Sequence, residues 1–304
     1  PTRSRGLGDV YKRQDEDSIE PWNDSGVGAP PTSRINQGII EGVGCRSIYG
    51  ITSSEKYMYF IGSDAHAYRV TGFTSQEITN PVIAHHFRSL DVANCRVDFI
   101  DVNGHKFIMY YFVEDNECWV FSESSGQWFE VGNEQNTQGE SRRYQPVSPV
   151  FYDNSWVCGD ILSGTIFEFS TDYALNGVNS FTRERVVGTL SGEDVGQSGA
   201  MLEMSKLRIS METGTSNTFF SKQPPEISII PSFDGGYTWS RPIVLDIGRA
   251  GDFTLPIEVH MMQQFRRAVF KLRMTDLQGS FGSTDKNTSL SLFSASIDIR
   301  VVPY

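Results

Sequence analysis

The chain has 304 residues, of which 38% are hydrophobic and 12% aromatic, and its formal net charge is −11. This charge argues against a protein whose main task is to coat nucleic acid, because such binding depends on Lys and Arg neutralising phosphates. No stretch approaches the roughly 20 apolar residues of a membrane helix. The many aromatic residues, 28 Gly and 13 Pro favour an all-β protein.

The first 14 residues, PTRSRGLGDVYKRQ, begin without Met and match nothing further along the chain. They resemble a translated adapter sequence found at the ends of metagenome-derived reading frames. We therefore set residues 1–14 aside as an artefactual leader. We also expect the natural N-terminus, with any blades that it encodes, to be missing.

The segment from Cys95 to Val131 is organised as four short strands in succession. Val97, Phe99 and Val102 alternate with polar residues, and Asn103-Gly104 supplies a two-residue hairpin turn. The following run, KFIMYYFV, is apolar without alternation, as in a strand covered on both faces. Four antiparallel strands joined by tight turns predict one blade of a β-propeller.

This pattern recurs on both sides of the segment. Ile48, Phe99 and Val150 occupy matched positions 51 residues apart, and Tyr68, Trp119 and Phe167 are matched aromatics. A period of about 50 residues is typical of radially repeated blades. We predict an incomplete propeller over residues 15–190, with a sandwich of accidental spacing as the alternative.

After residue 190 the composition shifts, and residues 191–304 predict an antiparallel β domain resembling a sandwich. Its clearest motif is the Asp-box pattern S-x-D-x-G-x-T-W, formed by Ser232, Asp234, Gly235, Gly236, Thr238 and Trp239. We expect the glycines to adopt positive φ, the Ser and Asp side chains to bind turn amides, and Trp239 to be buried beneath the corner.

No spacing of Cys and His predicts a zinc site, and we expect Cys45, Cys95, Cys118 and Cys158 to be reduced. His85-His86 lies in a loop-like region with no nucleophile beside it, so we predict neither catalytic nor cofactor-binding residues. Two polar loops are candidate interfaces, represented by Gly132, Glu134, Arg142 and Arg143 in one and by Glu193 and Asp194 in the other.

The run from Pro224 to Asp276 resembles the C-terminal region of phage stabilisation proteins, the packaged-DNA stabilisation or tail-hub proteins of short-tailed phages. The resemblance rests on the DGGYTW hairpin, the Gly248–Gly251 turn and the VFKLRMTD strand. Residues 151–169 are also similar to that family. A departure occurs at 260–264, where HMMQQ replaces the family's Trp-Arg-x-Leu-Gly-like segment.

The resemblance implies a structural virion protein, not an enzyme, that attaches below the portal, closes the DNA channel and stabilises the packaged genome. Its implied partners are the portal ring, the tail needle and other tail proteins, with DNA touched only in passing and no membrane. It implies a homo-oligomeric ring, a hexamer, in the phage tail, assembled in the bacterial host cytoplasm.

The main alternative is a sialidase-like glycoside hydrolase, which would need a pair of carboxyl groups in a cleft and a cluster of Arg. Arg46, Arg69, Arg96 and Arg183 are available, but no pattern brings them together. A carbohydrate-binding propeller is the other alternative, because aromatic side chains can stack on sugars.

Overall fold

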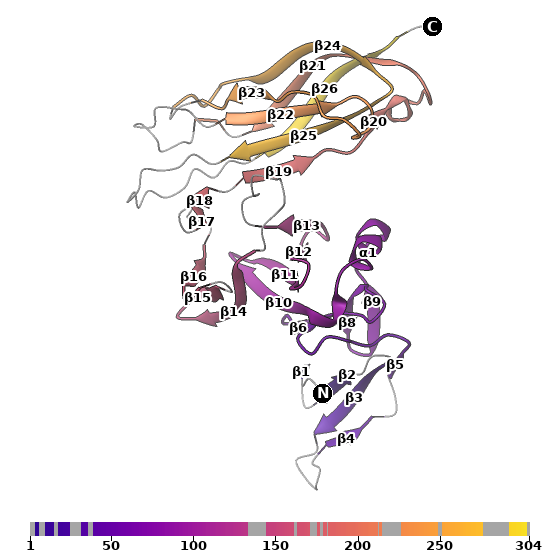
Figure 1. The fold of residues 1–304 in the computed structure, drawn as a ribbon, viewed down its shortest axis with the longest axis vertical. Helices are drawn as coiled ribbons and strands as arrows, with labels where there is room; N and C mark the ends of the chain where they lie inside the picture. The colour runs from indigo at the N-terminus through magenta and orange to yellow at the C-terminus, as the bar shows by residue number, and fades with distance from the viewer. Residues whose placement is uncertain are drawn as a thin grey trace. The chain divides into compact units, whose positions relative to one another are not determined.

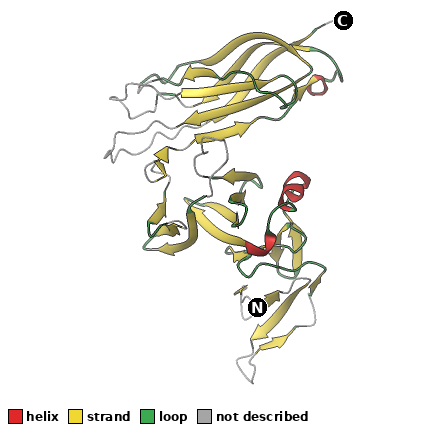
Figure 2. Cartoon of the chain, viewed as in Figure 1, coloured by secondary structure: helices red, strands yellow, loops and turns green. Residues whose placement is uncertain are grey.

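The computed structural model describes residues 4–5, 10–14, 18–24, 32–35, 39–132, 144–160, 163–170, 175–176, 179–180, 182–211, 213–214, 226–248, 251–275 and 292–302. In this part of the chain strands dominate, accompanied by the short helix α1 (Pro81–Phe87) and two 3-10 turns (Figure 2). The chain divides into two compact units, Pro1–Ser170 and Thr171–Tyr304 (Figure 1). The prediction of an all-β fold is confirmed.

The first unit begins with a sheet in the order β1–β2–β3–β4, in which β5 also pairs with β3. Its strands are β1 (Ser4–Arg5), β2 (Val10–Gln14), β3 (Ser18–Asp24), β4 (Thr32–Arg34) and β5 (Ile40–Glu41). Residues 1–14, set aside as a leader, thus contribute two of these strands.

Three meanders follow this sheet, each antiparallel and each in chain order. The first contains β6 (Ile51–Ser53), β7 (Met58–Ile61), β8 (Ala67–Thr71) and β9 (Thr74–Glu77). The second contains β10 (Cys95–Val102), β11 (His105–Phe112), β12 (Glu117–Ser122) and β13 (Trp128–Val131). The third contains β14 (Pro146–Tyr152), β15 (Ser155–Asp160) and β16 (Ile166–Phe169). These are the blades of a partial propeller.

The central strand β11 shows how the blades are held together. Ile108, Tyr110 and Phe112 pack into a core shared with the first blade, where they meet Tyr59 and Phe87. The intervening Met109 and Tyr111 pack into a second core with residues of the third blade, including Trp156 and Phe169. Both faces of β11 are therefore covered, as its unbroken apolar run predicted.

The repeat is correct for the third strand of each blade but wrong for two positions of the first strand. Tyr68, Trp119 and Phe167 lie on β8, β12 and β16, each facing the preceding sheet. Ile48, however, precedes β6 and is 70% exposed. Val150 lies on the opposite face from Phe99, because the register of β14 shifts between Val147 and Val150. An extra residue in a β-bulge turns every following side chain to the other face.

His85 and His86 lie in α1, which corrects the prediction of a loop. Asn80 caps the helix by accepting a hydrogen bond from the Ile83 N–H at 2.8 Å, and Pro81 occupies the first turn. Ile83, Ala84 and Phe87 form the buried face of α1. Asn-Pro was thus a usable helix-start signal.

The second unit consists of two packed sheets and a small hairpin. The hairpin joins β17 (Leu175–Asn176) to β18 (Asn179–Ser180). One sheet has the order β19–β25–β22–β23, with β20 also paired to β25, and the other has the order β24–β21–β26. Their strands are β19 (Thr182–Val186), β20 (Leu190–Ser191), β21 (Leu202–Met211), β22 (Glu226–Ser232), β23 (Ile243–Asp246), β24 (Ile257–Phe265), β25 (Arg267–Thr275) and β26 (Leu292–Val301).

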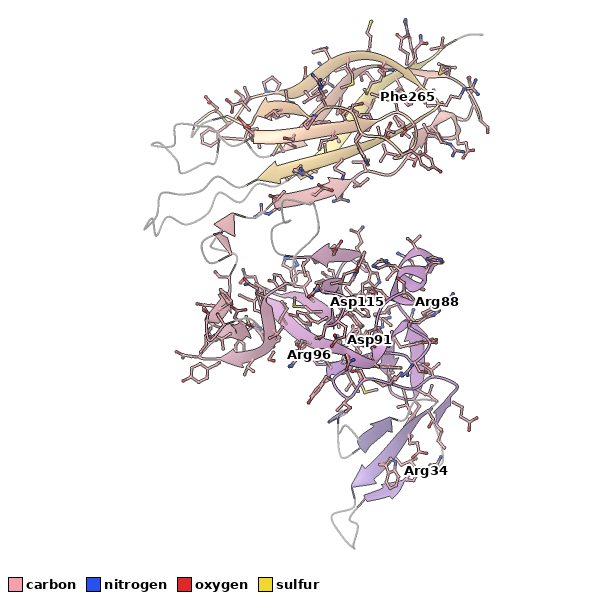
Figure 3. All side chains as sticks on the ribbon, viewed as in Figure 1. Arg34, Arg88, Asp91, Arg96, Asp115 and Phe265 are labelled. Carbon is pink, nitrogen blue, oxygen red and sulfur yellow. The ribbon has the colours of Figure 1, made fainter. Side chains whose placement is uncertain are left out.

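One apolar core fills the space between these two sheets. Ala268, Phe270 and Leu272 enter it from β25, and Leu207 and Ile209 enter it from β21. Phe265, labelled in Figure 3, ends β24 and joins the same core. The C-terminal region is a β-sandwich, as predicted.

The boundary between the units differs from the predicted one at residue 190. β19 was assigned to the propeller, but it pairs along β25, with Thr182 opposite Thr275 and Val186 opposite Lys271. This pairing is long-range in sequence, so local patterns did not reveal it. The second unit starts at Thr171.

Candidate functional site

The second unit contains a pocket of about 410 Å³ where three separate segments meet. It is lined by Thr189, Ser191, Glu193, Asp194, Asp234, Gly235, Tyr237 and Arg267. The structure thus brings together two segments that the sequence analysis selected independently, the Asp-box turn and the loop containing Glu193 and Asp194.

Arg267, the first residue of β25, explains why these segments converge. On one side it pairs with Ser191 of β20, and on the other it forms a parallel bridge with Asp234. A Cβ atom on Gly235 would lie 3.8 Å from Arg267 Cδ, so the glycine lies against the arginine stem. The backbone of Arg267 is therefore held between the two segments, and Arg267 lines the pocket beside them.

The Asp-box turn has the geometry expected for such a corner, apart from its tryptophan. Gly235 and Gly236 have φ values of 84° and 101°, a region that favours glycine. Asp234 Oδ1 accepts hydrogen bonds from Thr238 N at 3.0 Å and from Ser232 Oγ at 2.7 Å. Ser232 Oγ also accepts one from Gly236 N at 2.9 Å.

These bonds fix the charge of Asp234. Together they hold the pKa of Asp234 well below its usual value. The hydrogen bond from the Thr238 hydroxyl lowers this pKa most, followed by those from the Thr238 N–H and the Ser232 hydroxyl. Hydrogen bonds to an ionised carboxylate favour that form. Asp234 therefore stays ionised at pH values below the usual pKa of an aspartate, and its main role is to close the turn.

Trp239 does not lie buried beneath this corner, which corrects that prediction. It is 38% exposed, and Lys271 Nζ lies 4.7 Å from its ring centroid. Lys271 belongs to the outward-facing residues of β25, so Trp239 covers the outer surface of the sheet instead of entering the core. A cation over a tryptophan ring is a favourable contact.

The segment after β20, predicted as a polar loop, forms a capped 3-10 turn. Ser191 caps η2 (Gly192–Val195), and Asp194 Oδ2 accepts a hydrogen bond from Ser191 N at 2.7 Å. A Cβ atom on Gly192 would lie only 2.2 Å from Gln197 O, so glycine is required there. The turn presents Glu193 and Asp194 at the pocket in a fixed geometry.

Three pocket side chains remain available for a ligand. Glu193 and Arg267 make no side-chain hydrogen bond or ion pair with any other described residue, whereas Asp194 and Asp234 are engaged in turns. Tyr237 is 90% exposed at the pocket. Sequence analysis missed Tyr237 and Arg267, because Tyr237 is the variable position of the motif and Arg267 reaches the site only through long-range pairing.

Of the four residues that represent the other predicted interface loop, one lies within the described part of the chain. Gly132 is exposed at the end of β13. Glu134, Arg142 and Arg143 lie outside the described residues.

The first unit has polar clusters around α1. His86 Nε2 lies 2.6 Å from Glu117 Oε2, which also accepts a hydrogen bond from Trp119 Nε1 at 2.9 Å. Arg88, labelled in Figure 3, directs its guanidinium to His66 Nε2 at 3.1 Å. These contacts tie α1 to neighbouring strands.

The arginines considered for a sialidase-like site are held separately where contacts are described. Arg69 donates a hydrogen bond to Gln76, and its guanidinium carbon lies 4.6 Å from the Tyr57 ring centroid. Arg96 pairs with Asp98 at 2.8 Å.

No described group of three or more His, Cys, Asp or Glu side chains could hold a metal ion. Among the helices in the described ranges, none is long and apolar enough to cross a membrane.

Comparison with known proteins gives structural matches only. No family model and no curated protein matches the chain. An exo-β-1,3-galactanase from Phanerochaete chrysosporium, solved with β-1,3-galactotriose, aligns at 9% identity over 95% of this chain and 78% of its own, with a TM-score of 0.28. A family 43 arabinoxylan arabinofuranohydrolase from Bacillus subtilis aligns at 10% identity over 93% and 59%, with a TM-score of 0.25. A further glycoside hydrolase aligns at 10% identity over 98% and 83%, with a TM-score of 0.22.

These matches are to glycoside hydrolases, so they contradict the predictions of a structural tail-hub protein and of a protein that is not an enzyme. Neither prediction is kept. The resemblance to phage stabilisation proteins, the portal and tail partners and the virion location stay predictions. At these TM-scores the matches assign no activity to this chain.

Proposed function

We propose that this chain is a carbohydrate-binding protein and that the pocket beside the Asp-box turn holds the sugar. The observation that carries the proposal is the exposure of Tyr237, 90%, next to a polar pocket whose Arg267 guanidinium and Glu193 carboxylate have no partner among the described residues. A sugar ring has apolar C–H faces and a rim of hydroxyl groups. It therefore needs one aromatic surface and several fixed donors and acceptors.

Each available side chain has a distinct role in this proposal. Tyr237 stacks on one face of the sugar ring, Arg267 donates hydrogen bonds to hydroxyl oxygens, and Glu193 accepts from hydroxyl groups. Arginine suits this task because its donors form a rigid, planar fork. The capped turn and the pairing of Arg267 hold these groups in place before the ligand binds, which reduces the ordering cost of binding.

The pocket also has carboxyl groups, so cleavage must be tested beside binding. Glycoside hydrolysis usually requires a carboxylic acid that donates a proton and a second carboxylate. Asp234 does not suit the donor role, because its pKa is lowered. Glu193 is the pocket carboxyl with no partner among the described residues, and it is therefore the group to replace in an activity assay.

The proposal is tested by titrating the full chain with oligosaccharides of neutral, amino and acidic sugars in a calorimeter. We expect Tyr237→Ala to lower the affinity for the bound glycan by roughly tenfold, the loss of one aromatic contact of about 1.4 kcal/mol. Tyr49→Ala is the matched control, because Tyr49 is 67% exposed in the other unit. Product analysis with and without Glu193→Gln reports cleavage separately.

Two results would overturn the proposal. One is the absence of binding to every glycan in the panel. The other is binding that Tyr237→Ala and Arg267→Gln both leave unchanged while Tyr49→Ala weakens it.

A further inference from the structure

The pocket beside the Asp-box turn carries more negative than positive charge. Three of its lining side chains are the carboxylates of Glu193, Asp194 and Asp234, and one is the guanidinium of Arg267, which leaves two negative charges in excess. The hydrogen bonds of the turn lower the pKa of Asp234, so its carboxylate stays charged. All four residues belong to the second unit and to the described part of the chain.

The three carboxylates differ in how far their own turns already use them. Asp234 Oδ1 accepts a hydrogen bond from Thr238 N at 3.0 Å, and Asp194 Oδ2 accepts one from Ser191 N at 2.7 Å. The Glu193 side chain has no hydrogen-bond or ion-pair partner among the described residues, while the capping of η2 fixes its backbone. Glu193 is therefore the carboxylate with which a ligand can pair.

The aromatic side chain at this pocket suits the same kind of ligand. Tyr237 is 90% exposed and lines the pocket together with Glu193. A cation is attracted both to the face of an aromatic ring and to a carboxylate, and its hydrogen bonds to the carboxylate are stronger than those of a neutral donor. A positively charged group on the sugar therefore gains more here than a hydroxyl group does.

We propose that the sugar held in this pocket is an amino sugar with a free, protonated amino group, which pairs with Glu193. The inference rests on the proposed function and narrows its ligand class. Arg267 then donates hydrogen bonds to hydroxyl oxygens of the same sugar. An acidic sugar could pair with Arg267, but its carboxylate would enter a pocket that already holds three others, and like charges brought together in this way repel.

The test compares three oligosaccharides of equal length by calorimetry on the full chain, composed of glucosamine, N-acetylglucosamine or glucuronic acid. At about pH 6, where a free amino group is protonated, we expect the glucosamine oligomer to bind roughly tenfold more tightly than the acetylated one. The glucuronic acid oligomer should bind most weakly. Raising the salt from about 0.05 M to about 0.5 M should reduce the preference for glucosamine, because salt screens exposed charges.

Two variants assign this preference to one side chain. Glu193→Gln removes the charge at nearly constant size, and it should weaken glucosamine binding more than N-acetylglucosamine binding, so that most of the tenfold preference disappears. Glu226→Gln is the matched control, because it removes an exposed carboxylate of the same unit outside the pocket lining. It should leave the preference in place.

The possible failures separate this inference from the proposed function. Equal or tighter binding of the acetylated or the acidic oligomer, still weakened by Tyr237→Ala, would overturn the amino-sugar inference and leave the sugar site standing. The inference also fails if Glu226→Gln abolishes the preference as fully as Glu193→Gln, since the overall charge would then be its cause. Absence of binding to these three and to every other glycan would overturn the proposed function, and the inference with it.

Discussion

The strands β11 and β25 each lie at the centre of their unit, but they are stabilised in different ways. β11 is buried on both faces, between two sheets that flank its own. β25 is buried on one face, while Lys271 and Arg273 on the other bind Glu184 of β19 at 3.0 and 2.8 Å. The first unit thus uses its central strand to join blades, whereas the second uses it to separate a core from a polar surface.

This difference predicts the largest effects in β11. Tyr111→Ala and Phe112→Ala, which remove neighbouring side chains on opposite faces, should each lower the free energy of unfolding by about 3–5 kcal/mol. Both side chains are almost fully buried, at 1% and 0% exposure. Urea unfolding of the full chain, followed by fluorescence, measures the two costs. If one of the two substitutions were nearly neutral, only one face of β11 would be covered.

In β25 the same neighbouring-pair experiment should give unequal results. Phe270→Ala should cost about 3–5 kcal/mol because it opens a cavity in the sandwich core. Lys271→Ala should cost about 1 kcal/mol or less, since it removes a partly exposed ion pair and a contact with the Trp239 ring. Equal costs for Phe270 and Lys271 would contradict the one-sided burial of this strand.

A smaller effect is expected at Trp239, although tryptophan is the largest side chain. Trp239→Ala should lower the free energy of unfolding by about 1 kcal/mol or less, because its ring lies on the surface over Lys271. Trp128 provides the comparison within the first unit, where its indole donates to Ile78 O at 2.9 Å and its ring lies 5.1 Å from Tyr110. Trp128→Ala should be clearly more costly, and the reverse order would be inconsistent with the structure.

The effect of Asp234→Asn, which removes the charge but keeps an acceptor oxygen in the turn, should depend on pH. The folded-state pKa of Asp234 is lowered. The stability linked to its ionisation is therefore fully present above the unfolded-state pKa of about 3.9 and is lost as the pH falls further. The difference in melting temperature between the natural chain and Asp234→Asn should be constant from about pH 6 to 8 and narrow below about pH 4. A difference that stays constant into acid would show that the turn does not depend on this charge.

The parts of the fold that could be predicted were those determined locally. The run at β11 indicated a strand with two covered faces, and Tyr68, Trp119 and Phe167 marked the third strand of each blade. Alternation correctly assigned Ala268, Phe270 and Leu272 to a core. In each case the side-chain pattern of one segment contained the necessary information.

The errors arose where the structure depends on distant or irregular features. The bulge in β14 changes the face of Val150 without leaving a clear signal in the sequence. The ring of Trp239 lies against Lys271 on the outer surface of the sheet. The pocket forms because Arg267 pairs with both Ser191 and Asp234. Such contacts join segments more than 25 residues apart, which no local pattern encodes. The Asp-box residues were identified correctly, but the site beside them was not.

The stacked blades of the first unit also determine how that unit should open. Among the described residues of this unit, each blade shares cores with its immediate neighbours, so the free energy of local unfolding should vary along the stack. The second blade, held on both sides, should have the slowest amide hydrogen exchange, with Tyr110 and Tyr111 at its centre. Amide hydrogen exchange should be faster in the third blade, because its sheet is held by the one described core that it shares with the second blade. Fluctuations in this unit would then begin at an end and spread inward.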